Sequence, residues 1–537
     1  MKKQTRSRLA RAVLTVLSVV LLLAPIALPI GAYLLSPAVY THTFYGELDD
    51  KYDALYAAEG RKIVIVGGSS VAFGYDSQTL SDLFGRPVIN FGLYAALGTK
   101  LMLDLSEDAI REGDIVLLAP ELDPETLSLY FNGGAALRAL DEKPAMLAGI
   151  KRENYPALLG ALWSVAGEKL RYRKDGVPDP TGVYNSRNFN AAGDLVYRRD
   201  ANVMDGYYDP TTPIIPDGTV VSPDFLDYLN AYIDRVQKKG ATVYFAFCPM
   251  NAMALTENRN GEESPLALDA LETEIGETKI KITGVSLDEG AVARCDRFQA
   301  YLTRNLHCPI LGQMTDFVYP PNYFFDTNFH LNDTGVDWHT RGIGNLLYRS
   351  ETGTDETPLP RMGRLPDLAI PLGDMETVYE VGDLRYRLTL SETFSVVGLS
   401  DAGEEKETVV LPPSITVYDA NLECEITCPV ASISSEAFAS ATRLHTVVIG
   451  DTSRMRLIGT RAFAGSSVVD LYLFCPVEGF LAGKDMLGGA RSDFRIYVGR
   501  DLGYDTDYSW SEINVKGQPK VLVETDKTFA DFADVGN

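Results

Sequence analysis

A run of four apolar β-branched residues, Ile63–Val66, ends abruptly at a pair of glycines, Gly67 and Gly68. A short, uninterrupted apolar run is typical of a strand buried on both faces, as in a parallel sheet. Comparable runs occur at Pro87–Asn90, Asp114–Leu118 and Ala241–Cys248. Helical patterns separate them, at residues 76–84, 99–111 and 224–239, and another, at 40–58, precedes the first. This alternation predicts an α/β domain with a largely parallel sheet.

The length of 537 residues predicts at least two domains. We expect the α/β domain to cover residues 37–349, with a large insertion at about 132–221, where Tyr, Asn, Asp, Gly and Pro are frequent and no period is evident. Residues 350–367 contain three prolines and two glycines, which indicates a linker over about 350–373. The remaining segment, 374–537, has short β-rich units and predicts a separate domain.

The N-terminal segment predicts a membrane helix. Five basic residues and no acid lie in the first eleven positions, and the first acidic residue is Glu47. The 24 residues from Ala12 to Leu35 carry no charge, and as a helix they would extend about 36 Å, enough to cross a hydrocarbon core of about 30 Å. A cleaved signal peptide has a shorter apolar stretch of about 7–15 residues. We therefore expect residues 1–36 to form an uncleaved signal anchor that spans the cell membrane once, with the bulk of the chain extracellular.

Charge and cysteine content exclude several classes of function. The net charge of −24 combines a basic tip of +5 with a body of 44 basic and 73 acidic residues, or −29. Such a body repels polyanions, so nucleic acid is excluded as a partner. The six cysteines are dispersed, and Cys424-x3-Cys428 lacks the second ligand pair of a zinc site. We expect buried thiols, or one or two disulfides, and no metal.

The C-terminal segment contains an internal repeat. Residues 433–449 align with 458–474 at an offset of 25 residues, so that Ala437-Phe438-Ala439 matches Ala462-Phe463-Ala464. The alignment also matches Leu444, Val447 and Ile449 with Val469, Tyr472 and Phe474, and a weaker third copy places Leu487, Phe494 and Tyr497 in these positions. A period of this length predicts a solenoid of leucine-rich-repeat type.

The repeated pattern I-x3-A-F-x5-L resembles the BspA-like leucine-rich repeats of bacterial surface proteins, over roughly residues 374–523. In that family the repeats are associated with adhesion and ligand binding. The resemblance therefore implies a β-rich solenoid that binds a ligand at the cell surface.

Two segments of the α/β domain contain candidate catalytic residues. Ser69 follows the first predicted strand and the Gly-Gly pair, at the sheet edge where α/β proteins usually bind ligands, although Val71 replaces the second glycine of a G-x-S-x-G elbow. His330 follows Asp326 by four residues, and this carboxylate is placed to orient the imidazole. The alternative interpretations are a serine-rich turn and a polar loop that caps a helix at Asn332 or Asp333. His42, His307 and His445 have simpler explanations as surface or capping residues.

Together, GGSS-x3-G at residues 67–74 and D-x3-HLN-x2-G at 326–335 resemble the SGNH/GDSL hydrolase superfamily. The resemblance is closest to its membrane-anchored branch, which includes the teichoic-acid D-alanyl transfer protein and alginate O-acetyltransferase-like proteins, and it covers about residues 37–349. It implies a three-layer, flavodoxin-like fold with Ser69 as nucleophile, His330 as general base and acid, and Asp326 as its partner. Ser70 is the alternative nucleophile. Because the superfamily more often separates Asp and His by three residues, Asp333 and Asp337 remain alternatives to Asp326.

The resemblance also implies an oxyanion hole. Its donors in the superfamily are the nucleophile's own N–H, here that of Ser69, a glycine N–H after the second strand, here Gly92, and an asparagine after the third strand. In this chain the third strand is followed by Ala-Pro-Glu-Leu-Asp at 119–123, without a G-x-N-D motif. Loss of one oxyanion donor lowers the rate by about 10²–10³. The transfer-protein branch shares this departure, so it favours a transferase over a hydrolase.

The implied chemistry is acyl transfer through an ester on Ser69, without a cofactor or metal. We therefore expect an esterase or O-acyltransferase that modifies an extracellular polysaccharide or teichoic-acid-like polymer. Proteins of this branch often work beside a membrane-embedded acyltransferase, which the resemblance implies as a partner. The alternative is a non-catalytic surface adhesion protein that acts through its repeats.

Overall fold

The computed structural model describes most of the chain. The described residues are 2–180, 182–199, 202–204, 208, 212–255, 266–275, 278–287, 289–360, 369–370, 377–389, 393–420, 423–450, 455–477, 480–483, 486–500, 502–504 and 521–532. For residues 2–13, 16–17, 20–21, 266–275, 278–286, 369–370 and 481 only the backbone is described. Parts of the predicted linker, at 361–368 and 371–373, lie outside the described residues.

A parallel sheet forms the centre of the N-terminal part. Its strands are β1 (Ile63–Gly67), β2 (Val88–Gly92), β3 (Ile115–Ala119) and β4 (Thr242–Phe245), in the order β2-β1-β3-β4. All neighbouring pairs run parallel. Every residue of β1, β2 and β3 is buried, because helices cover both faces of the sheet. The mixed α/β architecture with parallel strands confirms the prediction from the apolar runs.

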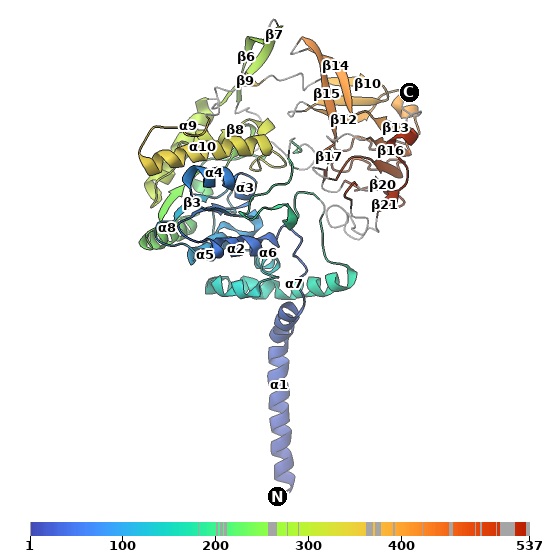
Figure 1. Cartoon of the computed structure of the whole chain (residues 1–537). Coiled ribbons are helices and arrows are strands. Elements are labelled where there is room, and N and C mark those ends of the chain that lie inside the picture. The colour runs from blue at the N-terminus through green and yellow to red at the C-terminus, as the bar shows by residue number, and fades with distance from the viewer. Residues whose placement is uncertain are drawn as a thin grey trace.

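Helices lie on both sides of this sheet (Figure 1). One side carries α2 (Glu47–Ala57), α5 (Thr99–Glu107) and α8 (Pro223–Lys238), which contact one another in that order. The other side carries α4 (Ser77–Phe84) and α10 (Asp333–Thr352), which also pack together. Asp76 caps α4, because its side chain accepts from the N–H groups of Gln78 and Thr79. The helix α9 (Glu289–Asn305) and a hairpin of β6 (Leu266–Ile275) and β7 (Thr278–Leu287), joined by β9 (Ala369–Ile370), complete this part.

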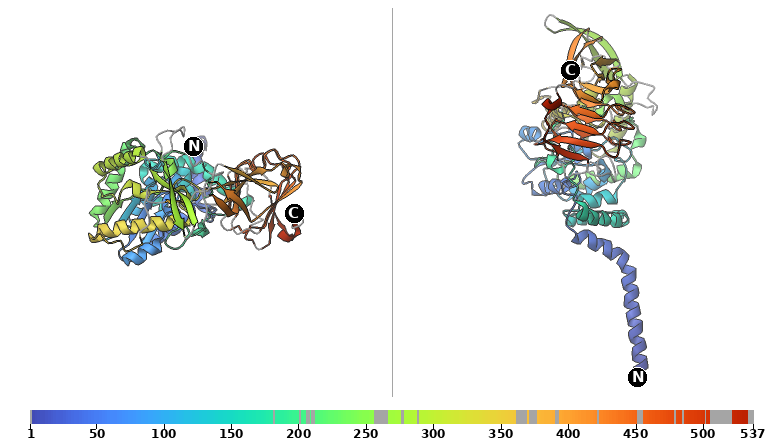
Figure 2. Two further views of the ribbon diagram at one scale, coloured as in Figure 1. Left: turned by 90° about the horizontal axis from the view of Figure 1, so that it is seen from above. Right: turned by 90° about the vertical axis from the view of Figure 1, so that its right-hand side faces the viewer.

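The N-terminal helix, α1 (Lys2–Leu35), extends away from the body and bends along its length (Figures 1 and 2). It contains Pro25 and Pro29, which remove backbone hydrogen bonds and so account for a bend. Among the described residues, no helix combines the length and the apolar character needed to cross a bilayer. The predicted anchor falls partly on side chains outside the described set, so it stays a prediction.

The helix α2 contains two buried carboxyl groups without described partners. Glu47 is 2% exposed, and its Oε1 accepts no hydrogen bond from the described groups. Burial raises the pKa of Glu47 to about 8 and that of Asp49 to about 7. Lys51, one turn further along α2, is also buried, and its Nζ donates to the carbonyl oxygens of Asn90 and Gly193. This lysine therefore connects the middle of β2 to the predicted insertion.

We expect Glu47→Gln to stabilise the protein at pH 8 but not at pH 4.5. Because the folded state holds a proton on Glu47 that the unfolded chain releases above about pH 4.3, stability falls as the pH rises toward 8. Glutamine has the same shape and cannot ionise, so the free energy of unfolding at pH 8 should rise by about 2–4 kcal/mol. Urea unfolding at both pH values measures the effect. Asp50→Asn, at an exposed position of the same helix, is the control, and an equal pH dependence in parent and Glu47→Gln would contradict the prediction.

The predicted irregular insertion contains two helices, α6 (Gly133–Ala139) and α7 (Tyr155–Asp175). The helix α7 has 21 residues, so the expectation of an irregular segment was wrong for this stretch. Leu158, Leu162 and Val165 are buried, while Leu159 and Trp163 on the same helix are exposed. Apolar residues on two faces obscure the 3.6-residue period, which explains why the sequence pattern did not indicate a helix.

The C-terminal part consists of two stacks of parallel strands. One is β13 (Thr408–Leu411), β16 (Thr446–Ile449), β18 (Asp470–Leu473), β20 (Arg495–Gly499) and β21 (Leu522–Thr525). The other is β12 (Phe394–Leu399), β15 (Cys424–Ile433), β17 (Leu457–Ile458) and β19 (Leu481–Ala482), with β10 (Val378–Val381), β11 (Leu384–Leu388) and β14 (Ser414–Asp419) attached in antiparallel fashion. Figure 2 shows the first stack as a ladder. A separate apolar core fills the space between the stacks.

The strand register corrects the predicted repeat alignment in one place. Ile433 pairs with Ile458 at the expected offset of 25 residues, but Val447 pairs with Leu471 at an offset of 24. Leu471 and Leu473 are fully buried in the core, whereas Tyr472 and Phe474 face the other side, against Phe532. The alignment through Tyr472 and Phe474 was therefore wrong by one residue, since a shift of one residue reverses the face of a strand. The offset is 25 again between β18 and β20, where Tyr472 pairs with Tyr497.

The two parts of the chain lie side by side (Figure 2) and contact each other through the insertion. Tyr197 donates from its hydroxyl to the carbonyl oxygen of Val477, 3.2 Å away. A Cβ built on Gly182 would lie 3.4 Å from the carbonyl oxygen of Phe480. Leu457 packs into the core of the α/β part. Residues 182–197 therefore connect the sheet domain with the C-terminal strands.

Candidate active site

Ser69 lies at the carboxyl edge of the central sheet, as the first residue of the short helix α3 (Ser69–Ala72). The two preceding glycines allow the end of β3 and the residues after it to approach closely. A Cβ on Gly67 would lie 2.5 Å from the carbonyl oxygen of Ala119, and one on Gly68 would lie 2.9 Å from Glu121 Oε1. Larger residues at either position would move Ser69, so the Gly-Gly pair positions the serine.

Asp326 and His330 lie on one tight loop. Phe325 N–H donates to the carbonyl oxygen of His330 at 2.8 Å, which closes the loop at its base. Inside the loop, the N–H of His330 donates to Thr327 Oγ1 at 3.1 Å. These bonds bring the side chains of Asp326 and His330, four residues apart, to the same side of the loop. The loop itself therefore accommodates this spacing.

The structure brings Ser69, His330 and Asp326 together in one chain of contacts. Ser69 Oγ lies 2.8 Å from His330 Nε2, and His330 Nδ1 lies 2.7 Å from Asp326 Oδ1. All three side chains are buried. The order nucleophile, imidazole, carboxylate is the one that general-base activation of a serine requires.

Two residues that the sequence analysis missed hold this arrangement. The Tyr184 hydroxyl donates to Asp326 Oδ2, leaving Oδ1 for the histidine. The Phe73 ring stacks on the His330 imidazole with ring centres 4.0 Å apart and an angle of 10° between the planes. Tyr184 belongs to the insertion, far from Asp326 in sequence. The only signal for a contact of this kind was the frequency of Tyr, Asn and Asp residues in that segment. Phe73 lies four residues after Ser69, within the motif that was singled out.

The alternative catalytic residues have other environments. Ser70 is fully buried, and its Oγ contacts no hydrogen-bonding group among the described residues. The Asp333 carboxylate accepts from the backbone N–H of Arg199 at 2.9 Å, and Asp337 pairs with Arg341 on the surface of α10. None of these groups is described next to the imidazole of His330, so the geometry favours Ser69 and Asp326.

The other buried histidine, His339, belongs to the core beneath the site. Burial lowers the pKa of His339 to about 3, so the ring is neutral at physiological pH. Its Nδ1 lies 3.1 Å from the hydroxyl of Tyr319. His339 is therefore a packed, uncharged side chain rather than a second base.

Gly92, predicted as an oxyanion donor, ends β2 directly beside Gly67 of β1. Its N–H already donates to Asn90 Oδ1, at a long distance of 3.3 Å. A Cβ on Gly92 would lie 2.3 Å from Val71 Cβ, so glycine is required for α3 to pack on β2. The structure thus assigns Gly92 a packing function, and its N–H becomes a donor only if the bond to Asn90 opens.

Glu121 lies two residues after the end of β3, in the segment where the predicted G-x-N-D motif is absent. Its Oε1 lies 2.8 Å from Ser69 Oγ and accepts from the N–H of Ser70 at 2.7 Å. The side chain is buried. A carboxyl group therefore contacts the proposed nucleophile on the side opposite the histidine, which the sequence analysis recorded only as a missing asparagine.

The two neighbours of Ser69 compete for one proton. The hydroxyl donates to one of His330 and Glu121, and the other must then donate to Oγ. The chain of contacts from Asp326 to Glu121 comprises three hydrogen bonds, whereas a neutral imidazole and a hydroxyl supply two protons. His330 can act as a base toward Ser69 only when the hydroxyl donates to the imidazole rather than to Glu121.

We expect Glu121→Gln to increase the reactivity of Ser69 about 10-fold at a fixed neutral pH. Glutamine with its oxygen in the place of Oε1 retains the acceptor for the Ser70 N–H and removes the negative charge beside Ser69 Oγ. The rate of labelling by a fluorophosphonate measures the effect. Glu125→Gln, at an exposed position of the same segment, serves as the control. A slower reaction in Glu121→Gln would mean that the carboxylate assists Ser69.

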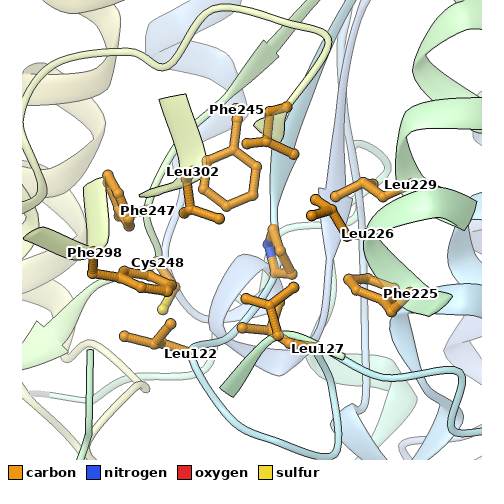
Figure 3. A pocket seen from close by; sticks show the side chains of 13 residues that line it. Leu122, Leu127, Phe225, Leu226, Leu229, Phe245, Phe247, Cys248, Phe298 and Leu302 are labelled. Carbon is orange, nitrogen blue, oxygen red and sulfur yellow. The ribbon is translucent and has the colours of Figure 1, made fainter. Parts of the chain in front are cut away.

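An apolar cavity begins next to Glu121, at Pro120 and Leu122 (Figure 3). The labelled aromatic and aliphatic side chains of β4, α8 and α9 surround it. Its volume is about 10 Å³, close to the space of a single water molecule. An acyl chain would therefore enter it only after movement of the lining side chains.

Metal-binding groups do not gather in the described part of the chain, where no set of three or more His, Cys, Asp or Glu side chains could hold an ion. Three of the cysteines, Cys248, Cys295 and Cys308, are buried free thiols. Burial raises the pKa of Cys295 and Cys308 to about 12, so these thiols are protonated.

Comparison with known proteins gives limited information. No protein-family model matches the chain, and no curated protein matches it. Among solved structures, the chain is similar to a leucine-rich repeat protein from Bacteroides capillosus, at 16% identity and a TM-score of 0.16. The match covers 29% of this chain and 98% of that protein.

Proposed function

We propose that the protein is a surface-anchored serine acyltransferase or esterase of the SGNH type, with Ser69, His330 and Asp326 as its catalytic residues. The carrying observation is the pair of contacts that place His330 Nε2 2.8 Å from Ser69 Oγ and His330 Nδ1 2.7 Å from Asp326 Oδ1. The strand order β2-β1-β3-β4 with helices on both faces supports the flavodoxin-like fold of that superfamily.

In the proposed reaction Ser69 Oγ attacks the carbonyl carbon of an ester while His330 Nε2 removes the hydroxyl proton. The bond to the leaving oxygen then breaks, and His330 returns the proton to that oxygen, which leaves the acyl group on Ser69. An acceptor hydroxyl or water, deprotonated by the same histidine, attacks this ester and restores Ser69. Asp326 holds the imidazole in orientation and stabilises its positive charge.

The acceptor is proposed to be an extracellular polysaccharide or teichoic-acid-like polymer. Support comes from the position of the C-terminal strands, which contact residues 182–197, the segment that also supplies Tyr184 to Asp326. A repeat domain beside the catalytic carboxylate is suited to hold a long polymer across the site. A membrane-embedded acyltransferase would supply the acyl group, and α1, which carries no charge from Ala12 to Leu35, would anchor the protein beside it.

Trapping of the acyl-enzyme tests the proposal. The full chain is mixed with an aryl acetate, quenched in acid after seconds, and digested for peptide mass spectrometry. The expected result is an acetyl group on Ser69. An acetyl group on Ser70, or none on either serine, would contradict the proposed mechanism.

A second candidate function is adhesion through the C-terminal strands. The observation that favours it is a polar groove of about 380 Å³ there, with Arg385, Ser440 and Arg443 among its lining residues. Guanidinium and hydroxyl groups bind sugar and acidic groups well. Glycan binding by the full-length Ser69→Ala variant, in the absence of any turnover, would favour adhesion as the principal function.

A further inference from the structure

The helix α7 exposes an apolar face that the proposed reaction does not use. Tyr155, Leu159, Trp163 and Leu170 are 42%, 51%, 56% and 50% exposed. Their spacing places them on one side of the helix, about 80° of arc apart at most. Gly160 and Gly167 lie at the edge of this side, with nothing within 4 Å of a Cβ built on either. Large apolar residues gathered on one exposed face mark an interaction surface.

Basic residues border this face. Arg152 precedes α7, Arg171 lies near its end, and Arg173 and Lys174 lie in its last turn, all with exposed side chains. Glu168, the one acid of α7 before its final residue, belongs to another side and forms a bidentate pair with Arg138. The border also contains the exposed acids Glu153 and Asp175, but the four basic residues outnumber them, so in a chain with a net charge of −24 this face is apolar with a net positive border. An anionic lipid surface has the complementary character.

The position of α1 points to the same partner. The helix α7 lies across the C-terminal end of α1, at the base of the body (Figure 1), and Figure 2 shows the two in the same relation. Lys169 Nζ of α7 donates to the carbonyl oxygens of Tyr33 at 2.8 Å and Ser36 at 3.2 Å, and it also pairs with Asp141. Tyr33 in turn donates from its hydroxyl to Leu137 at 2.7 Å. The junction between α1 and α7 is therefore closely held.

We propose that α7 lies in the interface of an anionic bilayer, parallel to its surface, with Leu159, Trp163 and Leu170 inserted among the lipids. This inference rests on the proposed anchoring by α1, since a helix that crosses the outer end of a spanning helix lies along the membrane plane. Tryptophan and tyrosine prefer this depth, and basic side chains beside them reach the lipid phosphates. The contact would hold the body of the protein at a set orientation instead of leaving it to rotate on α1.

Quenching of Trp163 fluorescence tests the proposal. The full chain, which has three tryptophans, is reconstituted into vesicles of phosphatidylcholine and phosphatidylglycerol, and the Trp163→Phe variant is subtracted to isolate the emission of Trp163. We expect phosphatidylcholine carrying a doxyl group near the headgroup to quench this emission at least twofold, and aqueous iodide to have little effect. Replacing both Leu159 and Leu170 with aspartate, at exposed positions where folding tolerates charge, should at least halve the lipid quenching.

Two results would overturn the interfacial position of α7, and a third would overturn the anchoring by α1 on which it rests. Quenching of Trp163 by iodide alone would place α7 in water. Protection from both quenchers would mean that protein covers the face, for example a second copy of the chain. Failure of the chain to float with the vesicles would refute anchoring by α1, on which the inference rests, whereas flotation with Trp163 in water refutes only the interfacial position of α7.

Discussion

Replacing Ser69 with alanine is expected to abolish labelling by a fluorophosphonate and to lower the hydrolysis of an aryl acetate by at least about 10³-fold, because the covalent route is lost. Ser70→Ala should leave both rates within about threefold of the parent. The Oγ of Ser70 contacts no described hydrogen-bonding group, and the N–H that Ser70 donates to Glu121 is retained in alanine. The two variants differ by one position in the same short helix, so each controls for the other.

Gel fluorescence and initial rates measure the effect, and thermal unfolding verifies that both variants fold. Labelling that persists in Ser69→Ala and disappears in Ser70→Ala would assign the nucleophile to the other serine. Labelling that persists in both would place the reactive group elsewhere. Either outcome would contradict the assignment that rests on the 2.8 Å contact between Ser69 and His330.

The central sheet was predictable because its strands are local patterns. Each buried strand is a short apolar run between turn residues, and the structure places β1 and β3 within one residue of the predicted runs. The helix α7 was not predictable in this way. Its pattern mixes the face that packs on the body with the face exposed at Leu159 and Trp163, and a period appears only when one face is polar.

The same distinction between local patterns and contacts made by the fold applies to the candidate site. Ser69 and the Asp326–His330 loop are each contained in one short segment, so residue type and spacing were sufficient to single them out. Tyr184 and Glu121 reach the site through the fold, from the insertion and from the end of β3. Their contacts depend on the packing of distant segments, which no local pattern reports. The missing asparagine at Glu121 was visible in sequence, but its contact with Ser69 was not.

The charge of the body bears on how a polymer would reach this site. If the acceptor is an anionic wall polymer, as proposed, a body of net charge −29 repels it, so long-range attraction would not explain its binding. Local groups would have to supply it, for example in the polar groove of the C-terminal strands, where Arg385 and Arg443 lie beside Glu404 and Glu405. Salt should then raise the association rate, because screening weakens the long-range repulsion more than it weakens the close contacts.

Asp326→Asn is expected to slow the acylation of Ser69 by about 10³–10⁴-fold. The carboxylate accepts from His330 Nδ1 and from the hydroxyl of Tyr184, and it is fully buried. An amide of the same shape can present its N–H₂ to Nδ1, which moves the ring proton to Nε2 and turns that nitrogen from an acceptor into a donor. His330 then no longer removes the proton of Ser69. Fluorophosphonate labelling over hours measures the rate.

The completeness of labelling separates this effect from unfolding. A folded Asp326→Asn variant should label slowly but fully, whereas a partly unfolded one would reach a plateau below the parent. Asp333→Asn is the matched control, since Asp333 pairs with Arg199 and not with His330; its rate should stay within about threefold of the parent. The labelling rate of Tyr184→Phe should lie between those of Asp326→Asn and Asp333→Asn, about 10-fold below the parent, because the change removes one of the two hydrogen bonds that orient the carboxylate. An equal loss in Asp333→Asn and Asp326→Asn would mean that the loop as a whole, rather than the Asp326 carboxylate, supports the histidine.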